Sequence, residues 1–510
     1  MTLSRRGLFA GGAGVGGAVL LGTPAVASAA PQLWAQPGAL GAPPVSGLHL
    51  QFGADASRQA VVSWHTTAAV AHPRVLLGTP DGGLGHAVPA DTTTYRDAKS
   101  GTEVRVHHAR LDSLRPGTDY VYAALHDGAA PELGTLRTAP RGRGAFRFTS
   151  FGDQGTPTLG KQANGTYVND NLGSPFGGDV TAAVEGAAPL FHLVNGDLCY
   201  ANLSTDRIRT WSDWFSTNSR SARYRPWMPA AGNHENELGN GPIGYGAYQT
   251  YFSVPDSGAD AETRGLWYAF TAGSVRVISL NNDDVVYQDG GNSYIHGYSG
   301  GAQQRWLEAE LRRSRSDPDI DWIVVCMHQV AISTVDKFNG ADLGIRETWI
   351  PLFDRYGVDL VVCGHEHHYE RSHPIRGQQP NDTRTPIPAD THTDVIDTTR
   401  GTVHMVIGGG GTSAPSNALF FSPAQCRVLT GVGPVDPATG KKAPVYVKEN
   451  APWSAFRDPD HAYGFAAFDV DPGRPGGSTT IDVTYYAVTG PYGTTTAVDR
   501  FRLTRPRKSF

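Results

Sequence analysis

Side chains that can bind metal ions follow five short apolar segments of this chain. In each case large apolar residues lead, mostly through a glycine, to an acid, an amide or a histidine. The five runs are Gly152-Asp153, Asn195-Gly196-Asp197 with Tyr200 close behind, Gly232-Asn233-His234, His328, and Gly364-His365-Glu366-His367. Carboxylate, phenolate, amide and imidazole groups are metal ligands, and metal ions held by them can promote hydrolysis.

The apolar segments before these residues are expected to be strands. They are Phe146 to Phe151, Leu190 to Val194, Trp227 to Ala231, Trp322 to Met327, and Val358 to Cys363. Open α/β sheets bind ligands beyond the carboxyl ends of their strands, so five such ends would gather the side chains around one point. A glycine before a ligand lets the chain turn sharply and approach the site closely.

Taken singly, each of these residues has a simpler explanation. A Gly-Asp pair after a strand usually forms a turn, and a single histidine such as His328 is more often a hydrogen-bonded core residue. All five runs occur together in one chain, however. This combination favours one shared metal site.

The order of the runs resembles the motif set of one enzyme family. GDxG, GDxxY, GNH, a single His after an apolar strand, and GHxH together resemble the purple acid phosphatases, within the calcineurin-like metallophosphoesterases. Tyr369-Glu370-Arg371, after the last run, adds to the similarity. The resemblance covers roughly residues 45–510, strongly around the motifs and weakly over 374–460.

This resemblance implies a centre of two metal ions. A ferric ion would be held by Asp153, Tyr200 and His367, and a divalent Zn, Fe or Mn ion by Asn233, His328 and His365, with Asp197 bridging the two. The ligand types agree, because a hard trivalent ion suits carboxylate and phenolate oxygens while the divalent ions accept imidazole and amide groups. Tyr200 is the discriminating residue, since most metallophosphoesterases have no tyrosine there.

The implied activity is hydrolysis of phosphate monoesters by a metal-bound hydroxide, with Asp197 and His234 as catalytic residues. The net positive charge of such a centre would attract an anionic phosphate ester. His234, beside Asn233, would contact the phosphoryl group or protonate the leaving oxygen; a role limited to orienting the site is equally open.

One departure from the family leaves the substrate open. Typical members carry histidines about ten residues after the single-His motif, where this chain has Val335-Asp336-Lys337-Phe338. Lys337 is either a replacement phosphate-binding cation or a solvated loop residue. A phosphodiesterase acting on phospholipid head groups or nucleotides is therefore the alternative. A non-catalytic protein whose metals only hold loops together is disfavoured by the complete ligand set.

The composition is that of a soluble globular protein of two or three domains. The 510 residues are 39% hydrophobic and 18% charged, and 62 glycines and 35 prolines indicate many turns and short strands. The net charge of −5 offers no basic surface, so nucleic acid is not an expected partner. The four cysteines, which form no CxxC pair, are expected to be buried small apolar residues.

Residues 1–29 resemble a twin-arginine export signal. Arg5-Arg6 precedes a glycine-rich apolar stretch and Ala27-Ser28-Ala29. The stretch is too short for a membrane span, and no other segment could cross a bilayer. We therefore expect a secreted protein, with residues 30–44 as a linker.

Residues 45–140 are expected to form a β-sandwich. Short alternating segments occur at Ala60 to Trp64, Arg74 to Leu77, Val104 to His107, and Tyr120 to Tyr122. The turn from Leu114 to Tyr120 is similar to one in fibronectin type III domains. The simplest role for this domain is a spacer or docking module without chemistry.

Residues 145–510 are expected to form a mixed α/β domain, and the resemblance implies an α/β/β/α layering. Ser299 is predicted to cap one helix, and Glu347 to Tyr356 to form another that ends at Gly357. Residues 374–400 and 412–460 are predicted to be loops or insertions. Strand alternation returns at Thr480 to Tyr486 and Asp499 to Leu503, which predicts a second sheet layer.

Overall fold

The structure is a computed structural model that describes residues 41–157, 162–163, 166–167, 171–238, 243–287, 295–438 and 442–508. The predicted signal peptide and residues 30–40 of the predicted linker lie outside the described residues. Among the helices that are described, none is long and apolar enough to span a membrane.

The N-terminal part consists of two four-stranded antiparallel sheets. One has the order β1 (Ser46–Phe52), β2 (Ala60–Thr66), β6 (Glu103–Leu111), β5 (Asp91–Arg96). The other has the order β4 (Gly83–Pro89), β3 (Arg74–Thr79), β7 (Asp119–Leu125), β8 (Glu132–Arg137). Every residue of β2 is buried. A strand that is buried along its whole length must have other elements packed on both faces of its sheet. On one face that element is α2 (Arg207–Ala222), which packs against the neighbouring strand β1.

The following part contains two seven-stranded sheets. The first has the order β13 (Trp227–Pro229), β12 (Phe191–Val194), β9 (Phe146–Phe151), β27 (Gly464–Asp471), β28 (Ser478–Gly490), β29 (Thr494–Pro506), β22 (Val395–Asp397). The second has the order β14 (Tyr268–Ala272), β15 (Val275–Ser279), β16 (Trp322–Cys326), β18 (Leu360–Cys363), β23 (Val403–Ile407), β19 (Tyr369–Ser372), β26 (Ser454–Arg457). The two sheets are mixed, with parallel strands where the metal-ligand runs follow.

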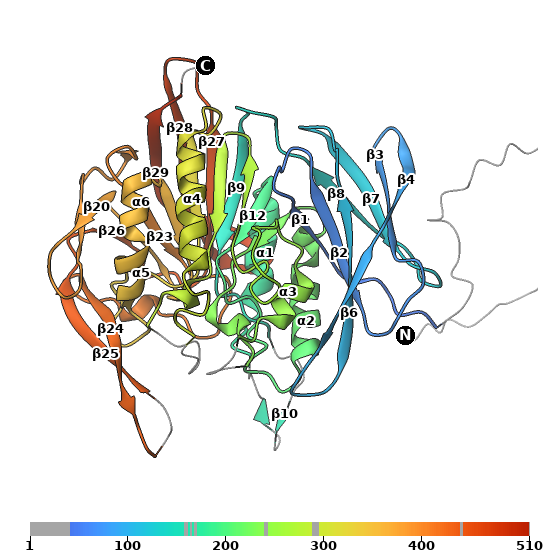
Figure 1. Cartoon of the computed structure of the whole chain (residues 1–510), viewed down its shortest axis with the longest axis horizontal. Helices are drawn as coiled ribbons and strands as arrows, with labels where there is room; N and C mark the ends of the chain where they lie inside the picture. Colours follow the sequence, from blue (N-terminus) through green and yellow to red (C-terminus); the bar gives the residue numbers. More distant parts are fainter. Residues whose placement is uncertain are drawn as a thin grey trace, which may run out of the picture. The chain divides into compact units, whose positions relative to one another are not determined.

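The two large sheets face each other through aromatic side chains. Tyr369 stacks on Tyr485 with 3.7 Å between ring centroids, and the indole N–H of Trp322 donates to Oγ1 of Thr479 at 2.9 Å. Helix α1 (Phe176–Gly186) packs on the first sheet, and α4 (Ala302–Ser316) on the second (Figure 1). The predicted α/β/β/α layering and the predicted second sheet layer are thus confirmed.

Two helix predictions were inaccurate. Helix α4 is capped by Gly301, which adopts a left-handed conformation with φ 78°, while Ser299 accepts the backbone N–H of Gln303 at 3.3 Å without being the cap residue. The expected helix up to Tyr356 is two helices, α5 (Leu343–Thr348) and α6 (Ile350–Tyr356). Pro351 has no N–H for a continuing helix, which explains the break. Gly357 does end α6, in a left-handed conformation.

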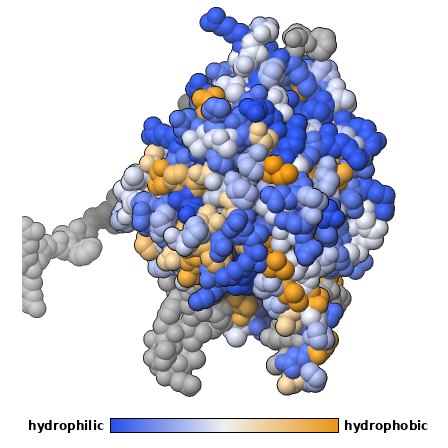
Figure 2. Space-filling view, turned by 90° about the vertical axis from the view of Figure 1, so that its left-hand side faces the viewer, coloured by the Kyte–Doolittle hydropathy of each residue, from blue (hydrophilic) through white to orange (hydrophobic). Residues whose placement is uncertain are grey.

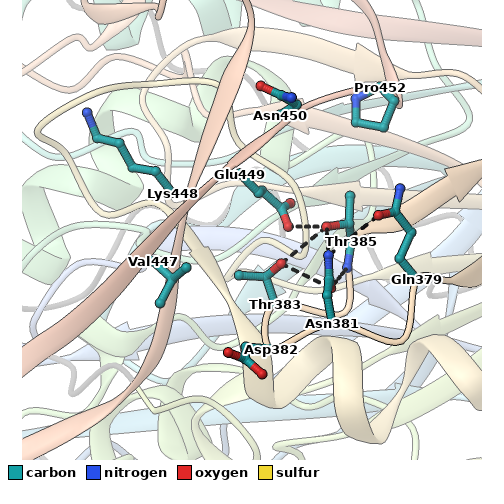
Figure 3. Close-up of a pocket in the computed structure, with 10 residues that line it drawn as sticks. All are labelled: Gln379, Asn381, Asp382, Thr383, Thr385, Val447, Lys448, Glu449, Asn450 and Pro452. Carbon is teal, nitrogen blue, oxygen red and sulfur yellow. Dashed lines mark hydrogen bonds between the residues drawn. The ribbon is translucent and has the colours of Figure 1, made fainter.

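The segments predicted to be loops contain several strands. Residues 374–400 hold β20 (Ile375–Gln378), β21 (Pro386–Pro388) and β22, and residues 412–460 hold the antiparallel pair β24 (Gln425–Val435) and β25 (Lys442–Asn450), followed by β26. The turn 379–385 and β25 line a polar pocket (Figure 3). Asn381, Thr383, Thr385 and Glu449 hydrogen-bond one another there, so these side chains join the turn to the strand.

The remaining elements are short. They are α3 (Gly246–Tyr251), β10 (Gln162–Ala163), β11 (Thr166–Tyr167) and β17 (Ala341–Asp342), with 3-10 turns at Asn233–Glu235, Asn282–Asp284, Asn417–Leu419 and Pro491–Gly493. The four cysteines are buried and free, as predicted. The face shown in Figure 2 is mainly hydrophilic, with apolar side chains in small groups.

Candidate metal centre

The five predicted strand ends meet at one place. In the first large sheet β9, β12 and β13 are parallel neighbours, and Asp153, Asp197 and Asn233 follow them. In the second sheet β16 and β18 are parallel neighbours, and His328 and His365 follow these. The site therefore lies where the carboxyl ends of strands from two facing sheets come together.

Asp153, Tyr200 and His367 form one group of donor atoms. The hydroxyl of Tyr200 lies 3.1 Å from Nε2 of His367 and 3.4 Å from Oδ1 of Asp153. The Nε2 atom of His367 lies 3.3 Å from the same Oδ1. All three side chains are buried. A carboxylate, a phenol and an imidazole thus lie together, the set of groups that the resemblance implies for a ferric ion.

Asp197, Asn233, His328 and His365 form the second group. The Nε2 atom of His328 lies 3.0 Å from Oδ2 of Asp197, 3.0 Å from Oδ1 of Asn233 and 3.1 Å from Nδ1 of His365. Potential ligand atoms of Asp197, His328 and His365 lie within 4.8 Å of one another, which makes this a possible metal site. Burial, and after it the charge of the Asp197 carboxylate, raises the pKa of Tyr200, so Asp197 acts on both groups.

Backbone carbonyl groups orient the two histidines that would bind through Nε2. Nδ1 of His328 lies 2.7 Å from the carbonyl oxygen of Asn195, and Nδ1 of His367 lies 2.7 Å from that of Ala414. Each Nδ1–H therefore donates to a carbonyl oxygen, so that Nε2, once it has no proton, faces the other donors with its lone pair. This tautomer is the one that metal coordination through Nε2 requires.

The glycines before the ligands are needed because backbone and ligands lie in contact. A Cβ atom on Gly364 would overlap Oδ2 of Asp153, and one on Gly232 would overlap Oδ1 of Asp197. Asp153, Asp197 and His365 themselves have positive φ, at 59°, 51° and 70°. This conformation strains the backbone of a non-glycine residue. Strained residues of this kind are found mainly at functional sites.

The charges of the site favour a cation. Burial opposes a charge on His328, but the carboxylate of Asp197 outweighs it and raises the pKa of His328 to about 10. Burial lowers the pKa of His365 well below its ordinary value and raises that of Tyr200 well above it. His365 is therefore neutral, as a histidine that binds a metal must be, and a Lewis acid would be needed to displace the proton of Tyr200. The donor set fits the two metal ions expected from the sequence.

His234 lies at the edge of both groups. Its Nδ1 is 2.9 Å from Oδ1 of Asn202, its Nε2 is 4.0 Å from Oδ2 of Asp197, and its ring centroid is 4.3 Å from that of Tyr200. Its backbone N–H donates to Oδ1 of Asp197 at 2.9 Å. The bond to Asn202 places a proton on Nδ1, and Nε2 is left free to act on a substrate.

Two residues that hold this arrangement together, Glu235 and Asn202, were not predicted from the sequence. The carboxylate of Glu235 accepts the backbone N–H groups of Asp197, Leu198 and Gly232 at 2.8–2.9 Å, and so joins two of the loops. Its position directly after Asn233-His234 was a signal that could have found it. Asn202, which contacts His234, has no such signal.

Lys337 is exposed and has a φ of 59°. Its neighbours contact the site: the ring of Phe338 lies 4.9 Å from that of His367, and Nδ2 of Asn339 donates to the carbonyl oxygen of His365 at 2.7 Å. An aromatic ring thus lies beside the first group of donors.

Comparison with known proteins agrees with this geometry. A family model for the purple acid phosphatase N-terminal domain matches residues 45–138, and a model for calcineurin-like phosphoesterases matches residues 179–369. An uncharacterized protein of Mycobacterium tuberculosis is 69% identical over 496 residues, covering 97% of this chain and 93% of that protein.

Relatives with a described activity are more distant. A phosphoenolpyruvate phosphatase of Allium cepa is 28% identical, covering 74% of this chain and 72% of its own, and a purple acid phosphatase of Glycine max is 27% identical, covering 64% and 65%. The solved structure of a purple acid phosphatase from yellow lupin seeds has a TM-score of 0.65 at 21% identity, covering 91% of this chain and 75% of that one. The chain is therefore a purple acid phosphatase-like metallophosphoesterase of the calcineurin-like superfamily, and a phosphatase.

Proposed function

We propose that this phosphatase hydrolyses phosphate monoesters at a centre of two metal ions. The observation that supports this best is the position of Asp197, whose Oδ2 lies 3.0 Å from Nε2 of His328 and whose charge also acts on Tyr200 in the other donor group. A carboxylate between two complete donor groups is what a bridging ligand requires. Fe(III) would be bound by Asp153, Tyr200 and His367, and a divalent Zn, Fe or Mn ion by Asn233, His328 and His365.

Bound metal ions would lower the pKa of a coordinated water and neutralise the phosphoryl oxygens. The chain's own residues set the charge around them. The two aspartates and a tyrosinate compensate only part of the charge of a trivalent and a divalent ion, so the centre stays positive and attracts an anionic ester.

His234 is the residue proposed to act on the substrate itself. Because Asn202 holds Nδ1 at 2.9 Å, Nε2 keeps one orientation, toward the carboxylate of Asp197. A phosphoryl group that enters between them meets Nε2, which can hydrogen-bond an oxygen or deliver a proton to the leaving oxygen.

The test is phosphate release from para-nitrophenyl phosphate by metal-loaded protein, together with metal analysis. We expect two metal ions per chain and activity that chelation abolishes. A fully loaded protein that releases no phosphate from monoesters would contradict the proposal.

A phosphodiesterase is the second candidate, favoured by Phe338. Its partly exposed ring beside His367 offers an apolar surface to a second ester substituent. Rates on para-nitrophenyl phosphate and on its bis-ester separate the two candidates, since a monoesterase prefers the first by a wide margin.

We also propose that the protein is exported by the twin-arginine route. Arg5-Arg6, the apolar stretch and Ala27-Ser28-Ala29 support this proposal. Replacing both arginines by lysine should leave the protein in the cytoplasm, as cell fractionation would detect.

A further inference from the structure

Three residues of the N-terminal sheet that contains β5, called the N-terminal sheet below, contact the loop that carries His234 and the loop that carries its partner Asn202. These residues, Tyr95, Asp97 and Lys99, lie at and just after the end of β5, and we refer to them as the tether. The Tyr200 loop, residues 195–206, carries Asn202. The His234 loop, residues 230–238, carries His234 itself. The bond between Asn202 and His234 joins the two loops at the site.

Tyr95 reaches the His234 loop. Its hydroxyl donates to Oε2 of Glu237 at 2.5 Å, and the indole N–H of Trp211 donates to Oε1 of the same carboxylate at 2.9 Å. Glu237 is only 4% exposed, and it lies three residues after His234. Both carboxylate oxygens are thus occupied, one of them by the N-terminal sheet.

Lys99 and Asp97 reach the Tyr200 loop and the helix that follows it. The ammonium group of Lys99 donates to the backbone carbonyl of Ser204. The carboxylate of Asp97 lies 3.3 Å from Nη1 of Arg207, the first residue of α2. The guanidinium of Arg207 also donates to the carbonyl oxygen of Glu237 and lies 3.8 Å from its carboxylate.

These contacts close a ring of interactions. It runs from Tyr95 to Glu237, through Arg207 to Asp97, and back along the N-terminal sheet; Lys99 adds a bond to the Tyr200 loop. Asp97 is fully buried and Arg207 is 8% exposed, so the ion pair is shielded from water and salt. Charged groups held in this way have few alternative geometries.

From these contacts we infer that Tyr95, Asp97 and Lys99 are positioning residues for His234, resting on the proposed role of His234 in phosphate ester hydrolysis. The N-terminal domain is then more than a spacer, because it sets the separation of the two loops and with it the direction of the His234 imidazole. A displacement well below 1 Å at a group that acts in the transition state lowers the rate, whereas metal binding by residues on strand ends is little affected.

Replacement of Tyr95 by Phe tests this inference, because it removes one hydroxyl and preserves the ring. We expect kcat/KM to fall about fivefold to tenfold, mainly through kcat, with metal content unchanged. The same change in an H234A background should have no further effect beyond about twofold, since Tyr95 acts through His234. Asp97→Asn should behave like Tyr95→Phe.

Tyr122→Phe is the matched control. The hydroxyl of Tyr122, on β7 of the other N-terminal sheet, also reaches the following domain and donates to the carbonyl of Arg223 at 2.7 Å, at the C-terminal end of α2. This variant should keep full activity. An equal loss in Tyr122→Phe, an undiminished loss in the H234A background, or no loss in Tyr95→Phe would overturn the inference.

A second measurement does not depend on activity. In metal-free protein labelled with ¹⁵N-histidine, the His234 side-chain signals are assigned by their loss in H234A. They should shift in Tyr95→Phe and stay in place in Tyr122→Phe; unmoved signals in Tyr95→Phe would contradict the tether. A wild-type protein inactive toward phosphate esters would defeat the proposed function alone, because this comparison still tests the contacts.

Discussion

The Nε2 atom of His328, which follows a strand of the second large sheet, lies 3.0 Å from Oδ2 of Asp197, which follows a strand of the first. The pair therefore joins the two sheets at the site. Because the charge of Asp197, after burial, also raises the pKa of Tyr200, a change at this one carboxylate should reach both groups of donors.

Asp197→Asn should remove most activity and lower the content of both metals. An amide keeps the size of the carboxylate but loses its charge and one ligand oxygen, so neither ion keeps its shared ligand. Activity should fall by a factor of about 1000 or more, in the range found for essential catalytic groups. Metal analysis checks the prediction, and loss of one metal with full retention of the other would contradict bridging.

His328→Ala or His365→Ala should mainly empty the divalent site. Both imidazoles belong to the second group of donors, and Nδ1 of His365 lies 3.1 Å from Nε2 of His328. The control is His192→Ala. It removes a buried histidine that is not one of the donors and whose Nδ1 lies 2.8 Å from Oγ1 of Thr149. If a His328 or His365 variant loses iron first, the assignment of ligands to the two metals is reversed.

Tyr200→Phe should abolish the visible colour of the protein. A phenolate bound to Fe(III) gives a charge-transfer band that carboxylate and imidazole ligands lack, so we expect a pink to violet wild type that chelation bleaches. Activity should fall less than in Asp197→Asn, because Tyr200 adjusts one ion and does not join the two.

The control for Tyr200→Phe is Tyr248→Phe. The hydroxyl of Tyr248 is equally buried but donates to the carbonyl of Pro229 at 2.8 Å, so the band should persist. A colourless wild type with full metal occupancy would mean two divalent ions or no Tyr200 ligand.

Lys337→Ala distinguishes a phosphate-binding cation from a surface residue. If Lys337 contacts the phosphoryl group in the transition state, the rate should fall about tenfold, or about 1.4 kcal/mol. Its exposure and its place beside Phe338 are compatible with such a contact. Lys508→Ala, whose ammonium group donates to the carbonyls of Arg315 and Asp317 at the C-terminal end of α4, is the control. An unchanged dependence of the rate on pH and substrate would make Lys337 a surface residue.

The stability of the protein should fall as the pH drops below 6.5. His49, His65 and His108, on the N-terminal sheet, face Tyr251, Ser212 and Thr250. Burial lowers their pKa from 6.5 to about 4, 3 and 3.

The sign follows from proton binding. Between pH 6.5 and 4 the unfolded chain takes up protons at these histidines and the folded chain does not, so acid favours unfolding. At pH 5 each should cost about 2 kcal/mol relative to pH 8. Urea unfolding at the two pH values measures the difference, and His65→Asn should reduce it. Equal stability at both would contradict the prediction.

Several features of the site could be predicted from sequence because their signals are local. An apolar run, a glycine and a ligand residue such as Asp153 are adjacent in the chain, and the strand ends were found in this way. The convergence of the strand ends follows once the strands are parallel. The resemblance to the purple acid phosphatases, which rests on the order of the motifs, then assigns the predicted ligands to two groups.

The features that were missed depend on tertiary contacts. Glu235 matters because its carboxylate accepts N–H groups from three residues, two of them in another loop. Strand β25 has few buried residues, so it lacks the apolar alternation that marks a strand. The contact of Tyr95 with Glu237 joins residues 142 positions apart. No short-range pattern encodes such a pair.

The position of β27 in the first sheet bears on how the site forms during synthesis. Strand β9, which leads to Asp153, pairs with β12 on one side and with β27, Gly464–Asp471, on the other. Until that late segment leaves the ribosome, the edge of β9 that will pair with β27 has unpaired backbone N–H and C=O groups. Such long-range pairing is slow, and a chain truncated before residue 464 would keep all its predicted ligands in sequence while lacking the strand that fixes the first of them.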